Sequence, residues 1–348
     1  MRRIVPIIFI ILFSNLIFAV TFDFKCIDQW KHEEIFGNHF FSIIDKDNEV
    51  VGSFYKSPIR IISRNKIIQF APRGEGPSEL LGLEALFEYK GDLAAVERPE
   101  KMKIFTKKQG TYVWKETKWI KRGRFAHVVK NGIFFDNKFF LAGVEFLTLK
   151  NDREVYFLRV LDGNGNLLKQ LIKNNSANPR FVLKNYYIKG YKKDRVFFLI
   201  ENELKVTLIS SKTLEIVKEV PLEIPAFYKK MPEDFYTFKK YAQSGNEFHL
   251  DLETWSMGYS KITNCCTTDK HLVLQIRTCN DKLKKFALLF YNAETFKLEN
   301  TVFIDDFFLG YKDGKYYFFA NGDPGRDDNT DDCIINIYAF TPSKGKGK

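Results

Sequence analysis

Three side chains near the C-terminus have the spacing of a calcium-binding loop. Asp327, Asn329 and Asp331 alternate along the chain, as the first ligands of such a loop do. The pattern then departs from the motif, because Asp332 replaces the expected glycine and Tyr338 the bidentate glutamate. Two interpretations stay open: a calcium ion as cofactor, or a solvated acidic loop and no cofactor.

A second set, His249, Asp251 and Glu253, would share one side of a strand, because strand side chains alternate. Such residues could bind a metal or transfer protons. They fall within a long stretch, residues 221–259, whose conformation the sequence does not predict. The chain has no nucleophile elbow, phosphate-binding glycine loop or dinucleotide fingerprint. We therefore predict no catalytic residues.

Cations are the most abundant candidates for ligand binding. The chain has 54 Lys and Arg against 43 Asp and Glu, a net charge of +11. Such a surplus attracts anionic partners, although a bias of composition toward lysine would also produce it. We predict ligand contacts from seven cations on one set of connections between strands: Arg73, Arg98, Lys118, Lys121, Arg122, Arg124 and Arg180.

Short β-strands must position all of these residues. Between His39 and Phe340 we count twenty-three, joined by tight turns rich in Asp, Asn and Gly. They group in fours, and the last strand of the sixth group is missing. The segment Val20–Ile27 can supply it. The sequence therefore predicts an all-β, six-bladed β-propeller, closed by pairing the N-terminal strand with the last blade.

In blades of four antiparallel strands, successive connections alternate between the two faces of the ring. All the short turns fall on one face, and every long connection falls on the other. Long loops on a rigid scaffold are where binding residues concentrate, so the second face is the predicted binding surface. We expect residues 221–259 to cap it, with a short helix from Pro232 to Ala242. The long connections are Pro72–Gly82, Thr117–Phe125, Lys173–Asn185, Pro221–Tyr259 and Asn321–Asp332.

The closing strand also suggests a disulfide. The chain has five cysteines, and in an exported protein cysteines can be oxidised to disulfides. The antiparallel register that places Cys26 opposite Cys333 also places Phe24 opposite Ile335, apolar against apolar. We therefore predict a Cys26–Cys333 disulfide that closes the ring.

Residues 1–19 have the features of a signal peptide, with Arg2 and Arg3 before an apolar run and Ala19 at the cleavage position. The run is about long enough to act as an uncleaved membrane anchor instead. Either way we expect an extracytoplasmic protein, periplasmic or secreted. It should be a monomer with one domain over residues 20–340 and a disordered basic tail over residues 341–348.

One short segment resembles a known family. Gly74, Gly76, Pro77 and Glu79 match the G-x-G-P-x-E stretch that closes an early blade in exported bacterial six-bladed β-propellers related to NHL-repeat proteins, while Ser78 stands where that family commonly has glycine. The resemblance implies a propeller fold and an extracytoplasmic location, and it carries over no catalytic residues. By residue type alone, the segment is a turn between blades.

Together these features favour an exported, non-enzymatic binding protein whose partner is an anionic polymer, a glycan, an acidic peptide or a protein. Nucleic acid is not expected, because no nucleic-acid-binding module occurs. A membrane partner is expected only if the N-terminal segment is retained. Two alternatives stay open. One is a calcium-dependent propeller enzyme of the lactonase or lyase type, which rests on fold analogy. The other is a structural component of a surface assembly.

Overall fold

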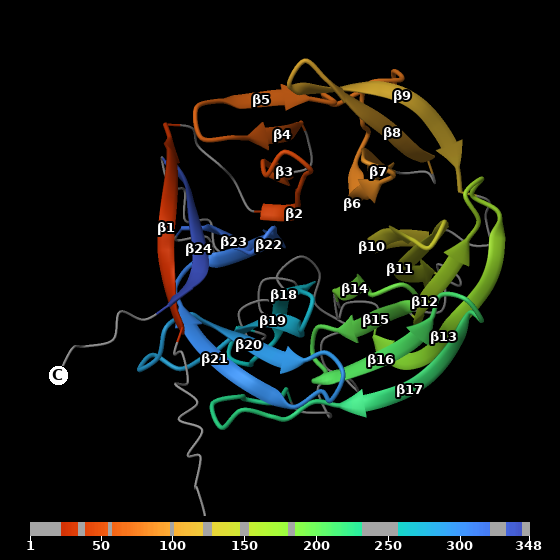
Figure 1. Ribbon diagram of the computed structural model, residues 1–348. Helices are drawn as coiled ribbons and strands as arrows, with labels where there is room; N and C mark the ends of the chain where they lie inside the picture. The colour runs from red at the N-terminus through yellow and green to blue at the C-terminus, as the bar shows by residue number, and fades with distance from the viewer. Residues whose placement is uncertain are drawn as a thin grey trace, which may run out of the picture.

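The structure is a computed structural model, and it describes residues 22–33, 39–54, 58–97, 101–120, 127–146, 153–179, 185–231, 257–320 and 332–342. Six antiparallel four-stranded sheets stand in a ring around a central axis, which confirms the predicted six-bladed β-propeller (Figure 1). No helix in the described part of the chain is long and apolar enough to cross a membrane.

We number the blades in the order in which their innermost strands occur along the chain. In blades 1 to 5 the four strands follow one another in sequence from the axis to the rim. Blade 6 runs outward as β22, β23, β24 and β1. The strands are β1 (Phe22–His32); β2 (His39–Ile44), β3 (Val50–Phe54), β4 (Ile59–Ile62) and β5 (Ile67–Phe70) in blade 1; β6 (Leu83–Tyr89), β7 (Asp92–Glu97), β8 (Lys101–Lys108) and β9 (Thr111–Trp119) in blade 2; β10 (His127–Phe135), β11 (Lys138–Phe146), β12 (Arg153–Leu161) and β13 (Leu167–Pro179) in blade 3; β14 (Tyr186–Tyr191), β15 (Arg195–Ile200), β16 (Lys205–Ser210) and β17 (Glu215–Pro221) in blade 4; β18 (Ile262–Thr267), β19 (His271–Arg277), β20 (Phe286–Asn292) and β21 (Leu298–Ile304) in blade 5; and β22 (Phe307–Lys312), β23 (Lys315–Phe319) and β24 (Cys333–Pro342) in blade 6.

The core is divided among the spaces between neighbouring blades. Each cluster of buried apolar side chains draws on adjacent sheets, because both sides of every blade must be covered. Phenylalanine fills much of this space. The rings of Phe70 and Phe105 meet 5.6 Å apart between blades 1 and 2, and those of Phe286 and Phe307 meet 6.0 Å apart between blades 5 and 6. The abundance of phenylalanine in the sequence therefore reflects the packing of blades.

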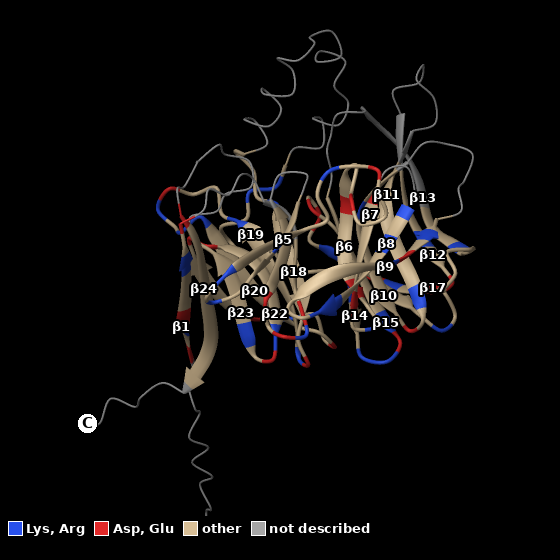
Figure 2. Ribbon diagram, turned by 90° about the horizontal axis from the view of Figure 1, so that it is seen from above, with Lys and Arg blue, Asp and Glu red and all other residues tan. Residues whose placement is uncertain are grey.

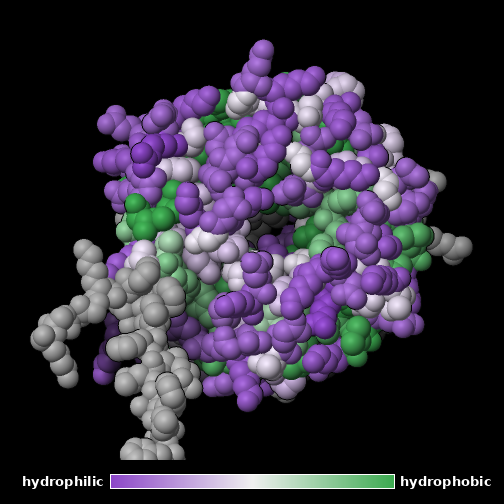
Figure 3. Space-filling view, viewed as in Figure 1, coloured by the Kyte–Doolittle hydropathy of each residue, from purple (hydrophilic) through white to green (hydrophobic). Residues whose placement is uncertain are grey.

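The inner strands join their neighbours through side chains as well as by packing. Ser42 of blade 1 donates a 2.9 Å hydrogen bond to the carbonyl oxygen of Leu309 in blade 6. Thr267 of blade 5 donates a 2.8 Å hydrogen bond to the carbonyl oxygen of Gly190 in blade 4. The inner strands lie around a central hollow. Figure 3 shows this hollow, with mostly hydrophilic residues on the surface around it.

The two faces of the ring differ as predicted (Figure 2). One face, which we call the short-turn face, carries the turn between the first and second strands of each blade and, in blades 1 to 5, the turn between the third and fourth strands. Several of these turns place residues such as Asn48, Gly91 and Gly314 at positive φ, where Asn and Gly are favoured. The other face, which we call the long-loop face, carries the connections between second and third strands and between blades.

The sixth blade is closed by the N-terminal strand, as predicted, because β1 pairs antiparallel with β24. The register differs from the predicted one. Cys26 lies opposite Tyr338 and Cys333 opposite His32, so the two cysteines are about 16 Å apart along the strands. Neither cysteine forms a disulfide, and the predicted disulfide between them is wrong.

Trp30 explains this register, and it lies beyond the segment predicted to pair. It is buried, with its ring centroid 5.9 Å from that of Tyr317. A β-bulge at Ile27 reverses the alternation of side chains between Phe24 and Trp30. Phe24 packs toward blade 5, 6.4 Å from Phe290, whereas Trp30 packs on the opposite side of the sheet. Apolar residues of the two strands can be placed opposite one another in more than one register. The observed register is the one that buries Trp30.

Candidate binding surfaces

On the short-turn face, blade 1 surrounds an ammonium group of blade 2. Lys107 Nζ lies 2.7 Å from Asp45 Oδ2, 2.6 Å from Asp47 Oδ2 and 2.6 Å from Glu49 Oε2. The Tyr112 hydroxyl donates a 3.1 Å hydrogen bond to Asp45. Burial disfavours the charged form of Lys107, but its hydrogen bonds to the three carboxylates outweigh this and raise its pKa. The ammonium fills the point where these carboxylates meet, so the cluster joins two blades.

A corresponding cluster joins blades 4 and 5 with the charges reversed. Glu294 forms ion pairs with Lys192 and Arg195 of blade 4. The Tyr191 hydroxyl lies 3.3 Å from Glu294 Oε1 and donates a 3.2 Å hydrogen bond to the carbonyl oxygen of Asp269. Hydrogen bonds from Lys192 and Arg195 lower the pKa of Glu294 to about 2. The carboxylate is therefore ionised at neutral pH and unsuited to general acid chemistry.

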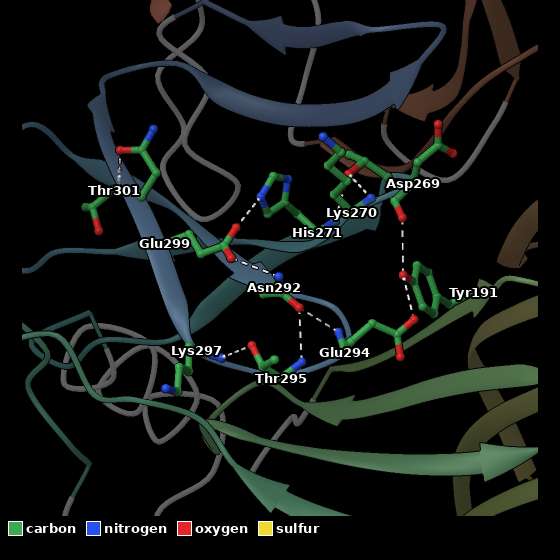
Figure 4. Close-up of polar contacts among 12 residues, drawn as sticks. Tyr191, Asp269, Lys270, His271, Asn292, Glu294, Thr295, Lys297, Glu299 and Thr301 are labelled. Atoms are coloured by element: carbon green, nitrogen blue, oxygen red, sulfur yellow. Dashed lines mark hydrogen bonds and ion pairs between the residues drawn. The ribbon is translucent and has the colours of Figure 1, made fainter. Parts of the chain in front are cut away.

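Beside this cluster, His271 forms the polar contact on the short-turn face that most resembles an acid–base pair. Its Nε2 lies 2.8 Å from Glu299 Oε2, and the Asn292 amide donates a 2.8 Å hydrogen bond to the other oxygen (Figure 4). All three residues belong to one blade, and the contacts tie neighbouring strands together. Among the described residues, no group of three or more His, Cys, Asp and Glu is arranged to bind a metal.

The thiols of β18 are not suited to nucleophilic chemistry. Cys265 and Cys266 are buried. Burial raises the pKa of Cys265 to about 11, and burial together with the neighbouring Cys265 raises that of Cys266 further. A reactive thiol needs the opposite, a pKa lowered in an electropositive and accessible setting. These two side chains therefore belong to the core of the propeller.

On the long-loop face, the segment that resembles the propeller family forms a compact turn between blades 1 and 2, as its residue types predicted. The Glu79 carboxylate accepts a 2.8 Å hydrogen bond from the backbone N–H of Gly76. A Cβ atom at position 74 would lie 2.1 Å from the same carboxylate, so Glu79 could keep this position only beside a glycine. Beneath the turn, Lys103 donates a 2.9 Å hydrogen bond to the Gly76 carbonyl oxygen and pairs with buried Glu97 at 2.9 Å. The motif is therefore explained by its structural role.

The predicted ligand-binding cations lie partly outside the described residues. Arg73 is exposed on the turn between blades 1 and 2, on the predicted face. Lys118 is not in a loop. It lies in β9, half-buried, 3.5 Å from Glu116 and over the ring of Tyr89. The remaining candidates lie outside the described residues, as do the helix predicted for residues 232–242 and the calcium ligands: Arg98, Lys121, Arg122, Arg124, Arg180, Asp327, Asn329 and Asp331.

Lys229 and Ser260, at the two ends of the predicted cap, are joined by hydrogen bonds. The backbone N–H of Lys229 donates a 3.0 Å hydrogen bond to Ser260 Oγ, and the N–H of Ser260 donates a 2.9 Å hydrogen bond to the carbonyl oxygen of Lys229. These two bonds bring both ends of the insertion together on the long-loop face. The ammonium of Lys229 lies 5.0 Å from the centroid of the Tyr259 ring. An exposed cation and an aromatic ring thus stand together where the insertion leaves the ring of blades.

Sequence reasoning missed a group on the rim of blade 2. Trp114, Thr117 and Trp119 share one side of β9, with Trp119 opposite Lys101 in β8. Trp114 is 40% exposed and Trp119 61% exposed. We call these four residues the tryptophan strip. Trp119 was expected to belong to a loop, and only its pairing within a strand reveals which residues accompany it.

The comparisons with known proteins support the fold alone. No family model matches the chain, and no curated protein matches its sequence. A protein described as exported, from Bacteroides fragilis NCTC 9343, is similar in structure, with a TM-score of 0.53 and 14% identity over 91% of this chain and 94% of that chain. The β-propeller domain of Cps50 (Swd1) from Myceliophteria thermophila has a TM-score of 0.42 and 11% identity, over 92% and 100% of the two chains. A protein of unknown function from Bacteroides caccae has a TM-score of 0.40 and 11% identity, over 83% of each chain.

Proposed function

We propose that the protein is an extracytoplasmic, non-enzymatic binding protein that holds an anionic polymer on its long-loop face. The observation that carries the proposal is the presence, on the long-loop face, of exposed cations that no described carboxylate neutralises. Cations are paired with carboxylates on both faces, as Lys107 is on the short-turn face and Lys103 and Lys284 are on the long-loop face. Arg73 and Lys229 lie exposed on the long-loop face, and no described carboxylate pairs with either of them.

Unpaired cations leave a positive potential that attracts a polyanion from a distance and weakens as salt screens it. Cations outside the described residues, in particular Lys121, Arg122 and Arg124, are proposed to extend the same surface. The partner would then be recognised by its charge and bound without turnover. A calcium ion held by Asp327, Asn329 and Asp331 belongs to the competing enzymatic interpretation.

The test is a triple variant, Lys121→Ala with Arg122→Ala and Arg124→Ala, assayed for binding to polygalacturonate, heparin and polyglutamate at rising salt. The matched control removes three exposed lysines from the short-turn face: Lys46→Ala, Lys108→Ala and Lys193→Ala. Both variants lose the same net charge. We expect binding to fall at least tenfold in the first variant and to change little in the control. Equal losses, or affinity that does not depend on salt, would refute the proposal.

A further inference from the structure

The exposure of the tryptophan strip follows from the unequal lengths of two outer strands. Tyr112, at the start of β9, is buried against blade 1, with its ring 5.2 Å from that of Phe70. Phe70 is the last residue of β5, which has four residues against nine in β9. Farther along the same side of β9, blade 1 offers no strand to cover Trp114 and Trp119. Tryptophan is usually well buried, so two exposed indoles on one strand need a reason.

The two rings are held in place before any ligand arrives. The indole N–H of Trp114 donates a 3.1 Å hydrogen bond to Thr117 Oγ1. The ammonium of Lys101 lies 5.2 Å from the centroid of the Trp119 ring, a cation–π contact. Trp114 and Trp119 lie opposite Phe105 and Lys101, which are four residues apart, so the backbone positions of the two tryptophans are about 13 Å apart along the strand. These contacts restrict the two side chains in advance and so lower the conformational entropy lost on binding.

The backbone of β9 is a poor template for an added strand, which separates two classes of partner. A β-bulge interrupts its pairing with β8 at Ile104 and Phe105. Lys115 and Lys118 stand at this edge, and charged residues and bulges are the usual protection against strand addition. A partner would therefore meet the side chains of the strip and not the edge of the sheet. Among the described outermost strands, only β9 exposes tryptophan.

We propose that the tryptophan strip binds an anionic polysaccharide chain. The C–H faces of sugar rings stack on Trp114 and Trp119, because the electron-rich face of an indole attracts such C–H groups. A carboxylate or sulfate of the chain pairs with Lys101. The inference takes the negative charge of the polymer from the proposed function. The strip consists of other residues, on the two outer strands of blade 2, and its aromatic rings add that the polymer is a glycan.

The experiment compares full-length Trp119→Ala, Trp119→Phe, Trp114→Ala and Lys101→Gln for binding to polygalacturonate and heparin, with polyglutamate as the peptide polyanion. We expect Trp119→Ala to weaken binding of at least one glycan about tenfold, as loss of a stacking tryptophan does at other interfaces. Trp119→Phe should retain most of the affinity. The glycan should also shift the tryptophan emission of the wild type, and less so in Trp119→Ala. A urea midpoint for each variant verifies folding.

The outcomes separate this inference from the proposed function. Loss of glycan binding in Trp119→Ala with unchanged polyglutamate binding supports the strip. An equal loss for polyglutamate would make the surface a protein-binding one and overturn the inference. Unchanged glycan affinity in Trp119→Ala, or no glycan binding by the wild type, would also overturn it. If only the triple variant at positions 121, 122 and 124 loses binding, the proposed function stands and the strip does not.

Discussion

The junction between blades 1 and 2 and the junction between blades 4 and 5 use the same positions in the fold with opposite charges. At each, the first turn of one blade meets the second turn of the next. At the first junction, Lys107 of the later blade meets carboxylates of the earlier one and is only 6% exposed. At the other, Glu294 of the later blade meets Lys192 and Arg195 and is 42% exposed.

The propeller therefore requires complementarity at this position and not a particular sign of charge. The junction between blades 3 and 4 meets the same need with one hydrogen bond of 2.8 Å from the Ser211 hydroxyl to Asp136. What differs is burial. Breaking a buried ion pair leaves an uncompensated charge and is strongly destabilising, whereas an exposed pair is screened by water. The more deeply a junction is buried, the more the loss of its ion pair should lower the free energy of unfolding.

The largest effect is expected from Lys107→Met. The variant removes the cation and leaves three carboxylates together, with Asp45 only 2% exposed. We expect the free energy of unfolding to fall by about 3 kcal/mol. Urea unfolding followed by tryptophan fluorescence measures it, and Lys192→Met is the matched control at the exposed junction. Equal effects of the two substitutions would show that burial does not distinguish the junctions.

A smaller effect is expected from Tyr112→Phe. The hydroxyl is one of two donors to Asp45 Oδ2, the other being Lys107. Its removal should cost about 1 kcal/mol in the free energy of unfolding, as for one hydrogen bond in a site that keeps its ion pair. The urea midpoint should shift with no change in the slope of the transition. A loss as large as that in Lys107→Met would indicate that the phenol, and not the ammonium, holds the junction.

The smallest effect is expected from Glu294→Gln, and it should depend on pH. The pKa of Glu294 is lowered from 4.5 to about 2, so its contribution is complete above pH 4.5 and is lost as the pH falls through 2. The difference in urea midpoint between wild type and variant should therefore be constant near neutrality and shrink in acid. A difference that grows in acid would contradict the assignment.

Local patterns in the sequence predicted much of the fold. Alternating apolar residues and turns such as Asp45–Asn48 defined the hairpins, and their order fixed which connections share a face. The closing strand was also predictable, because one strand was missing from the count. Its register was not. The register depends on a bulge at Ile27 and on the burial of Trp30, in a space that exists only once the blades have assembled.

The candidate surfaces were predicted less well, since they depend on contacts between distant residues. The spacing of Asp45, Asp47 and Glu49 is visible in the sequence, but nothing near them indicates that Lys107 will lie between them. Lys118 was expected on a loop with other cations, and it packs between strands instead. The tryptophan strip could have been found by extending the last strand of blade 2 as far as Trp119 and asking which side chains alternate with it.

The closing pair of strands also determines how the molecule would respond to force. Phe22 lies opposite Pro342 at one end of the pair, and His32 lies opposite Cys333 at the other. A load applied between residues 22 and 342 would therefore act across the strands and break their hydrogen bonds one after another. A load between residues 32 and 342 would shear many bonds at once. The same ring should open at low tension when pulled from its two ends, and resist when the attachment point is moved along β1.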